Sequence, residues 1–240
     1  MTRIVISQPR YLPILSYLQR IHQADVFVFL DNVQRQYRGF ENRNQILIGS
    51  SRKWLTIPVR SSKFEIICNS YILDFNWVEE HQRKIKEAYK KHPFFNDSYI
   101  HNYYDGVIEI INQTNSSYSS TLIKLVSNAA QIFKIDATFV KASELDLPPA
   151  KGVENLFNIC EKLGASIYIS GANGRSYGVK NYFEQRGKKV LFHDPENYSY
   201  PQFRNEGDFL SFLSFFDPLF NIGYSETKML LYRPMNLSEE

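Results

Sequence analysis

Polar side chains that could do chemistry gather first in a loop that follows the apolar run at residues 4–6. Gln8 and Tyr11 lie in that loop, and Asp31 directly follows a second apolar run at residues 26–30. Ligands of parallel α/β sheets bind at the carboxyl ends of the strands. Gln8 and Asp31 are therefore candidate catalytic residues. The alternative is that both only satisfy backbone groups of their own loops.

A second candidate group lies in the basic stretch between residues 34 and 63. Strand alternation would place Asn42 and Asn44 on one face and Arg43 on the other. Arginine binds phosphate or carboxylate through its planar fork, and asparagine offers both a donor and an acceptor. Ligand binding by these residues and a solvated basic hairpin are equally favoured interpretations.

The third candidate group is a glycine-containing loop after the buried apolar run at residues 167–169. Its polar and small residues are Ser170, Gly171, Gly174, Arg175 and Tyr177. Two glycines would let the backbone approach a ligand, and the start of the following helix could receive an anion. An ordinary glycine turn is the simpler alternative.

His81 is a candidate general base on a predicted helix. Trp77, His81 and Ile85 share one face of that helix, which Asn76 can cap and Pro93 ends. A lone histidine on an apolar face is more often a core residue. Only a position beside the loops after the first two strands would favour catalysis.

Other chemistry finds little support in the sequence. The histidines lack metal-ligand spacing, and we expect no metal site. No common nucleophile or phosphate-loop motif occurs. Cys68 and Cys160 lie in apolar runs and are expected to be reduced, which favours the cytoplasm. A net charge of +3 does not predict nucleic-acid binding, and no apolar stretch is long enough to span a membrane.

The pattern of elements predicts an α/β fold. A strand, loop, helix and strand open the chain, and strands and helices alternate again after about residue 138. We expect a parallel or mixed, Rossmann-like sheet with flanking helices and a small basic β-hairpin formed by residues 42–48 and 54–59. Residues 1–240 should form one domain, with a helical subdomain at about 76–134. The apolar run 209–220 should be buried and divided at Asp217.

Several segments together resemble the WbqC-like family over nearly the full length. They are Gln8-Pro9-x-Tyr11-Leu12-Pro13, Ala24-Asp25-Val26-Phe27-Val28 with Asp31-x-Val33-Gln34, Asn42-Arg43-Asn44, residues 54–59, Tyr168-x-Ser170-Gly171 with Gly174-Arg175-x-Tyr177, and Ser214-x-x-Asp217-x-Leu219-Phe220-Asn221-x-Gly223. The family usually has histidine where this chain has Ser7. If that histidine is an obligatory base, His81 is the natural replacement.

The resemblance implies a bacterial protein encoded among genes for O-antigen, the outer part of lipopolysaccharide, and other surface polysaccharides. It also implies transfer of glycine or another acyl group to an amino sugar. The leading hypothesis is an enzyme that acylates or aminoacylates the amine of a nucleotide-linked amino sugar. ATP or another activated acyl donor is a candidate co-substrate, and a homodimer is one option for its assembly.

This hypothesis gives each candidate residue a role. Arg43, Arg175 and the loop 171–174 would hold phosphates; Gln8, Asp31 and Asn42 would orient the sugar; Tyr11 and Trp54 would stack on a ring; His81 or Asp31 would take the amine proton. The competing hypothesis is a non-catalytic nucleotide-sugar or glycan-binding protein of a polysaccharide assembly system, which needs no base. A weaker analogy links the opening unit to nucleotidylyltransferase-like folds, although their H-x-G-H loop is absent.

Overall fold

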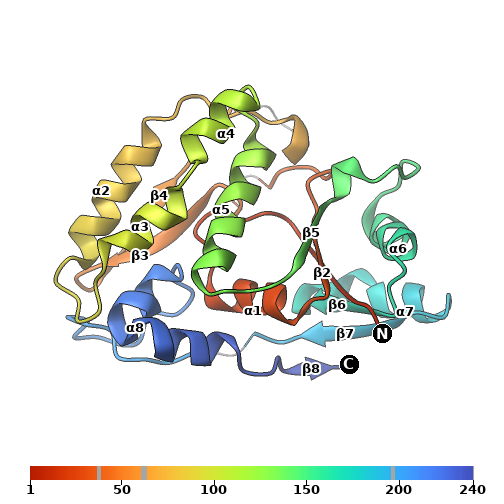
Figure 1. The fold of residues 1–240 in the computed structure, drawn as a ribbon. Coiled ribbons are helices and arrows are strands. Elements are labelled where there is room, and N and C mark those ends of the chain that lie inside the picture. The colour runs from red at the N-terminus through yellow and green to blue at the C-terminus, as the bar shows by residue number, and fades with distance from the viewer. Residues whose placement is uncertain (37–38, 61–63, 196–197, 240) are drawn as a thin grey trace.

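A computed structural model describes residues 1–36, 39–60, 64–195 and 198–239. It confirms the predicted α/β fold with a sheet of six strands, in the order β5-β2-β1-β6-β7-β8 (Figure 1). The strands are β1 (Arg3–Ser7), β2 (Val26–Phe29), β5 (Thr138–Lys141), β6 (Ile167–Gly171), β7 (Lys189–His193) and β8 (Leu237–Ser238). Pairing is parallel except between β7 and β8, so the sheet is mixed.

Alternating side chains of the central strands divide the interior into two clusters. Val5, Phe27 and Ile169 belong to the larger cluster, whereas Ile4 and Tyr168 belong to the smaller one. Successive residues of a strand point to opposite faces, so both faces of the sheet need a cover. This explains why the strands read as continuous apolar runs.

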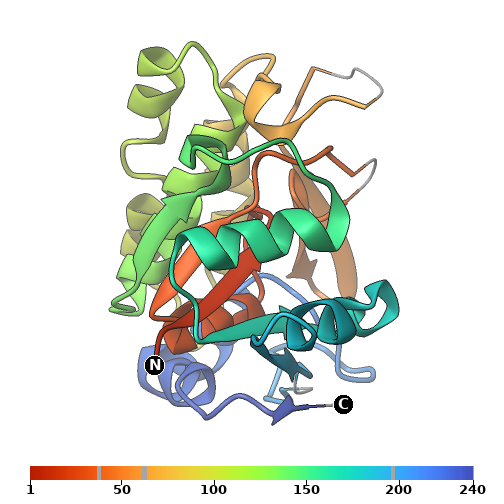
Figure 2. The ribbon, with the colours of Figure 1, turned by 90° about the vertical axis from the view of Figure 1, so that its right-hand side faces the viewer.

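Helices cover both faces of the sheet. The larger cluster includes side chains from α1 (Leu15–Gln23), α5 (Tyr118–Ile132) and α8 (Phe216–Leu231). The smaller cluster includes those from α6 (Gly152–Lys162) and α7 (Val179–Glu184), which lie in front of the sheet in Figure 2. Each helix therefore presents its apolar face to one side of the sheet.

The basic hairpin and a group of helices extend the larger cluster. The elements are β3 (Arg43–Ile48), β4 (Ser51–Thr56), α2 (Trp77–Tyr89), α3 (Asp97–Tyr104) and α4 (Val107–Gln113), with short 3-10 turns η1 (Ile67–Asn69), η2 (Ala142–Glu144) and η3 (Ala172–Tyr177). The sequence indicated one helical run over residues 99–111. The structure divides it because Gly106, with φ of 66°, ends the helical path there.

The apolar run near the C-terminus is divided as expected. Helix α8 begins at Phe216, and the completely buried carboxylate of Asp217 accepts hydrogen bonds from Tyr89, Tyr200 and Gln202. Burial raises the pKa of Asp217 despite these donors. The carboxylate therefore anchors the start of α8 to α2 and to the segment before it.

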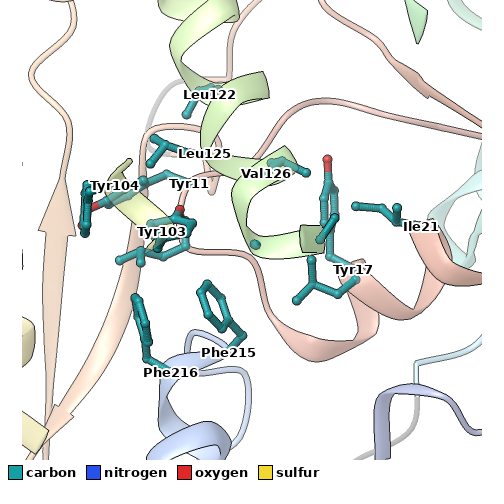
Figure 3. Packing of buried hydrophobic residues seen from close by; sticks show 14 of the residues in the cluster. Tyr11, Tyr17, Ile21, Tyr103, Tyr104, Leu122, Leu125, Val126, Phe215 and Phe216 are labelled. Carbon is teal, nitrogen blue, oxygen red and sulfur yellow. Dashed lines mark hydrogen bonds between the residues drawn. The ribbon is translucent and has the colours of Figure 1, made fainter. Parts of the chain in front are cut away.

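Aromatic residues from distant segments meet where the helices join the sheet. Tyr11, Tyr103, Phe215 and Phe216 pack closely beside α5 in Figure 3, and all four are completely buried. Their rings come from the loop after β1, from α3 and from the start of α8. No helix in the described ranges combines the length and apolar character needed to cross a membrane.

Candidate functional site at the carboxyl edge of the sheet

Strand β1 marks a reversal in the order of the sheet. The chain passes from β1 through α1 to β2 on one side, and later crosses to β6 and β7 on the other. Helices α1 and α7, which follow β1 and β6, therefore cover opposite faces (Figure 1). Ligands of open parallel sheets bind outside the strand ends at such a switch point. The ends are Ser7 on β1 and Gly171 on β6.

Arg20 on α1 places a cation at this switch point. Its Nη2 donates to Ser7 Oγ at 3.3 Å, and its Nη1 lies 3.3 Å from the position a Cβ would take on Gly171. Burial and the charge of Arg10 lower the pKa of Arg20 to about 10, so it remains protonated at neutral pH. No ion pair of Arg20 occurs among the described residues. A poorly solvated cation without a counter-ion favours the binding of an anion.

Arg10 is a second cation beside Arg20. The guanidinium carbons of Arg10 and Arg20 lie 5.7 Å and 5.5 Å from the centre of the Tyr17 ring. Tyr17 is held in place because its hydroxyl donates to the Gln8 carbonyl at 3.0 Å. Within the described ranges Arg10 also makes no ion pair. We call Arg10 and Arg20 the arginine pair.

The glycine loop fits closely around this region. A Cβ on Gly174 would lie 2.0 Å from Ser170 Oγ, so glycine is needed there for packing. Ser170 is buried, and its hydroxyl donates to the Gly171 carbonyl at 3.1 Å. His193 ends β7 beside Gly171. Its Nε2 is buried without a hydrogen-bond partner, and burial and the charge of Arg20 lower its pKa to about 4.

Arg175 and Tyr177 lie further along the same loop. Two nitrogens of Arg175 donate to the two carboxylate oxygens of Asp194, each at 2.7 Å, and one also donates to Ser238. Arg175 therefore connects η3 with β7 and β8. Tyr177 is 71% exposed. The predicted phosphate contact of Arg175 stays a prediction, and a ligand would compete with Asp194 for its donors.

Asp31 lies after β2, as the sequence indicated. It is 1% exposed, and its oxygens accept from Ser119 Oγ at 2.7 Å, Ser143 Oγ at 2.8 Å and Ser143 N at 2.9 Å. The carboxylate connects the end of β2 with α5 and η2. Its predicted role as a base stays a prediction, since these three donors already occupy the oxygens.

Tyr11 and His81 meet in the interior. The Tyr11 hydroxyl lies 2.7 Å from His81 Nδ1 and also bonds the Tyr104 hydroxyl, and Figure 3 shows the Tyr11 side chain pointing toward Tyr104. Tyr11 is completely buried and His81 is 3% exposed. Burial lowers the pKa of His81 to about 4, so it is neutral near pH 7. The structure thus connects the loop after β1 with α2, and the catalytic role of His81 stays a prediction.

The predicted hairpin residues have different surroundings. Asn44 is buried and donates to the Leu12 carbonyl, while Asn42 donates to the Ile57 carbonyl at 3.0 Å. Leu12 has a φ of 46°, a strained conformation that this bond helps to hold. Arg43 lies 4.3 Å from the ring centre of Trp54, which is 42% exposed. The hairpin therefore supports the loop after β1 on one face and exposes an Arg–Trp pair.

Three residues of this edge were not predicted to act. Arg20 belongs to no sequence motif, His193 has no metal-ligand spacing to the other histidines, and Glu41 is an acid in a basic stretch. Glu41 is 3% exposed, and its backbone carbonyl accepts from Tyr11 N at 2.8 Å. That isolated acid among arginines was the signal that could have identified Glu41.

Two surface hollows are lined by other residues. One is lined by residues that include Ile14, Tyr198, Tyr200 and Phe212. The other lies at the end of α2, with Lys90, Lys91, His92 and Arg204 among its lining residues. Neither hollow includes a predicted site residue. The structure thus brings Gln8, Ser170 and Gly171 to one edge with the arginine pair, and Asp31 ends the neighbouring strand.

Comparison with known proteins identifies the family of this chain. The chain is 27% identical to the uncharacterized protein Rv1507c of Mycobacterium tuberculosis, over 97% of this chain and 99% of that protein. No solved structure matches significantly. The model of the WbqC-like protein family matches residues 8–229, which include the loop after β1, the hairpin and the glycine loop. The chain therefore belongs to the WbqC-like protein family.

Proposed function

We propose that this protein transfers an acyl or aminoacyl group, such as glycyl, to the amine of a nucleotide-linked amino sugar. The observation that carries the proposal is the arginine pair at the switch point, where an anion would neutralise two neighbouring cations that have no ion-pair partner in the described part of the chain. A diphosphate suits this place because it offers several oxygens to planar guanidinium groups. The surface-polysaccharide context follows from the resemblance of the sequence to its family.

The arginine pair takes the main phosphate-binding role in this proposal. His193 Nε2, buried and without a partner, is an additional donor in the tautomer that protonates it. Gln8 and Gly171 lie at the ends of β1 and β6, where they would contact the sugar. Trp54 would stack on a base or a sugar ring at the exposed face of the hairpin.

The reaction has simple requirements. The neutral amine donates its lone pair to the carbonyl carbon of a thioester or acyl adenylate, and the N–C bond forms. The bond to the thiolate or adenylate then breaks, and the leaving group takes its electron pair. The nitrogen loses one proton in the process, so a proton acceptor is needed near it.

The competing proposal is a non-catalytic nucleotide-sugar or glycan-binding protein. One observation favours it: the oxygens of Asp31 and Nδ1 of His81, the two predicted bases, are engaged in buried hydrogen bonds. A binding protein would use the same arginine pair without any proton transfer. Detection of a product distinguishes the two proposals.

Binding to the arginine pair can be measured by calorimetry with inorganic diphosphate and uridine diphosphate-glucosamine. Replacement Arg20→Met should weaken both ligands about 10- to 100-fold, the range for a charge-assisted hydrogen bond. Arg83→Met is a matched control, because Arg83 pairs with Glu87 on the exposed face of α2. Equal affinity in the wild type and Arg20→Met would refute phosphate binding at this edge.

Catalysis is tested separately by mass spectrometry. The protein is incubated with amino sugars linked to uridine or thymidine diphosphate, together with acyl-CoA or with ATP and glycine. A product heavier by one acyl or glycyl group would support the transferase. Tight, Arg20-dependent binding without any product across these donors would support the binding protein.

A further inference from the structure

Glu41 is a buried carboxylate with few donors. Both of its oxygens accept from the single N–H of Gln36, at 3.2 and 3.3 Å, and Glu41 makes no ion pair in the described part of the chain. A carboxylate can accept about four hydrogen bonds. Most of its capacity is therefore unused, although only 3% of the residue is exposed.

Two polar neighbours of Glu41 are also unsatisfied. The Tyr118 hydroxyl and Arg35 Nε are buried and have no hydrogen-bond partner. Arg35 directly precedes Gln36, whose N–H donates to the Glu41 carboxylate, and the charges of Glu41 and Arg35 both act on the pKa of Tyr118. We call Glu41, Arg35 and Tyr118 the Glu41 cluster. Buried polar groups without partners are rare in folded proteins, so the cluster is a candidate binding site for a polar ligand.

The unsatisfied atoms determine which polar groups this ligand must carry. Glu41 needs donors, Arg35 Nε needs an acceptor, and the Tyr118 hydroxyl can serve in either sense. A phosphate has only acceptors and would be repelled by Glu41. An amine beside a hydroxyl group fits, because the amine donates to Glu41 while the hydroxyl oxygen accepts from Arg35.

The Glu41 cluster lies next to the arginine pair. The charge of Arg10 acts on both Glu41 and Arg20, so Arg10 lies near both groups. A backbone hydrogen bond also joins the two groups, since Tyr11, the residue after Arg10, donates its N–H to the Glu41 carbonyl at 2.8 Å. A ligand with phosphate at one end and an amine at the other would use the arginine pair for the phosphate and Glu41 for the amine.

We infer that the Glu41 cluster binds the amine and adjacent hydroxyl of the acceptor sugar, and that Glu41 is the catalytic base. After the neutral amine attacks the acyl carbon, one N–H bond of the intermediate breaks, the proton forms an O–H bond with Glu41, and the nitrogen keeps the electron pair. The inference rests on the proposed function for the identity of the sugar. It assigns the proton transfer to a residue other than Asp31 or His81.

A matched pair of ligands tests the inference by calorimetry. Uridine diphosphate-glucosamine and uridine diphosphate-glucose differ in one amine and one hydroxyl group. The wild type should bind the amine-bearing ligand about tenfold more tightly, as expected for one charge-assisted hydrogen bond. Glu41→Gln should abolish this preference, because it weakens the binding of uridine diphosphate-glucosamine more than that of uridine diphosphate-glucose. Glu206→Gln, at an exposed loop position, is the control.

Two results would overturn the inference. One is equal binding of both ligands by the wild type, and the other is a preference that persists in Glu41→Gln. Tyr118→Phe adds a second variant, because it removes only the unpartnered hydroxyl. It should reduce the preference, with a larger loss of affinity for uridine diphosphate-glucosamine than for uridine diphosphate-glucose.

A second measurement separates this inference from the proposed function. If neither nucleotide sugar binds, the proposed function fails. Free glucosamine and glucose are then titrated into protein whose glutamate carboxyl groups carry ¹³C, and the carboxyl resonances are followed by nuclear magnetic resonance. Glu41→Gln identifies the Glu41 resonance by its loss. A shift of that resonance with glucosamine alone supports amine binding by Glu41. An unmoved resonance, as expected if the cluster holds only water, overturns it.

Discussion

At the scale of single residues, the carboxyl edge of the sheet carries a basic and an acidic side chain that are largely shielded from water. Arg20 and Glu41 lie near Arg10, and burial shifts the pKa of each toward its neutral form. Each charge costs folding free energy unless a partner arrives. Such unpaired groups are more typical of a binding site than of a structural core.

Glu41 should make stability depend on pH in a direction unusual for a carboxylate. Burial raises its pKa from 4.5 to about 7, so between these values the folded chain holds a proton that the unfolded chain has released. Stability therefore falls as pH rises through this window, by up to roughly 3 kcal/mol for this group. Chemical denaturation at pH 5 and pH 8 measures the change. Glu41→Gln should lose less stability than wild type across the window, and an identical loss in both proteins would contradict the assignment.

His81 should make stability depend on pH in the opposite direction. Its pKa is lowered from 6.5 to about 4, so stability falls as pH decreases through this window, where the unfolded chain binds the proton first. His81→Gln should remove this part of the acid sensitivity. It should also cost about 1–2 kcal/mol at neutral pH, because the Tyr11 hydroxyl loses a well-placed partner. Denaturation curves measure both effects.

The same variant tests the catalytic prediction for His81. If His81 only supports the loop after β1, turnover per folded molecule should change little. A loss of ~100-fold or more with normal ligand affinity would instead show that it acts as a base. Glu41→Gln serves as the comparison in the same assay.

Sequence reasoning located the loops of the site but not its charges. Gln8 and Gly171 follow apolar runs, and that pattern is local, so their place at the sheet edge could be predicted. The environment of Arg20 could not, because it depends on contact with β6, which lies far along the chain. For Glu41, burial raises the pKa, and the local sequence gives no sign of that burial.

At the scale of elements, the glycine loop depends on close packing between η3 and the sheet. The backbone of Gly174 is not in the left-handed region, but an added Cβ would meet Ser170 Oγ at 2.0 Å and Phe192 at 3.3 Å. Both of these neighbours belong to strands that end at the site. The glycine therefore sets how near η3 approaches the ends of β6 and β7.

Replacement Gly174→Ala should destabilise the fold by about 1–3 kcal/mol, the usual cost of overpacking. Thermal unfolding measures this loss. Gly207→Ala is the matched control, because its Cβ would meet no atom closer than 3.7 Å. A Ser170→Gly, Gly174→Ala double variant should recover part of the loss. Equal stability of Gly174→Ala and Gly207→Ala would show that η3 can move away without cost.

Element boundaries were predictable where glycine, proline or alternation marked them. Strand β3, helix α2 and strand β6 lie close to their predicted positions, whereas β4 begins at Ser51, before its predicted start at residue 54. Strand β8 was missed because its two residues carry no pattern and pair only through contact with β7. The division between α3 and α4 was not predicted, because apolar residues continue at helical spacing past Gly106 and a single glycine does not by itself end a helix.

At the scale of the whole molecule, the helical segment and the sheet share one continuous interior. The larger cluster includes Trp77 and Ile85 of α2 together with Val5 of β1 and Phe27 of β2. Hydrogen bonds cross the same boundary, between Tyr11 and His81 and from the Leu12 N–H to the Tyr103 hydroxyl. These contacts favour a chain in which the predicted helical subdomain, at about 76–134, does not unfold by itself.

We therefore expect a single cooperative unfolding transition for the chain. Trp77 is 3% exposed in the helical segment, and replacement Trp54→Phe leaves Trp77 as the remaining tryptophan reporter. Its fluorescence and the far-ultraviolet circular dichroism of the whole chain should follow the same denaturation curve, with equal midpoints and slopes. Trp54 lies on the exposed face of the hairpin, so its loss should leave the midpoint nearly unchanged. An earlier Trp77 transition would mean that the helical segment separates first, and the loop after β1 would then lose the support of Tyr103 and His81 before the sheet unfolds.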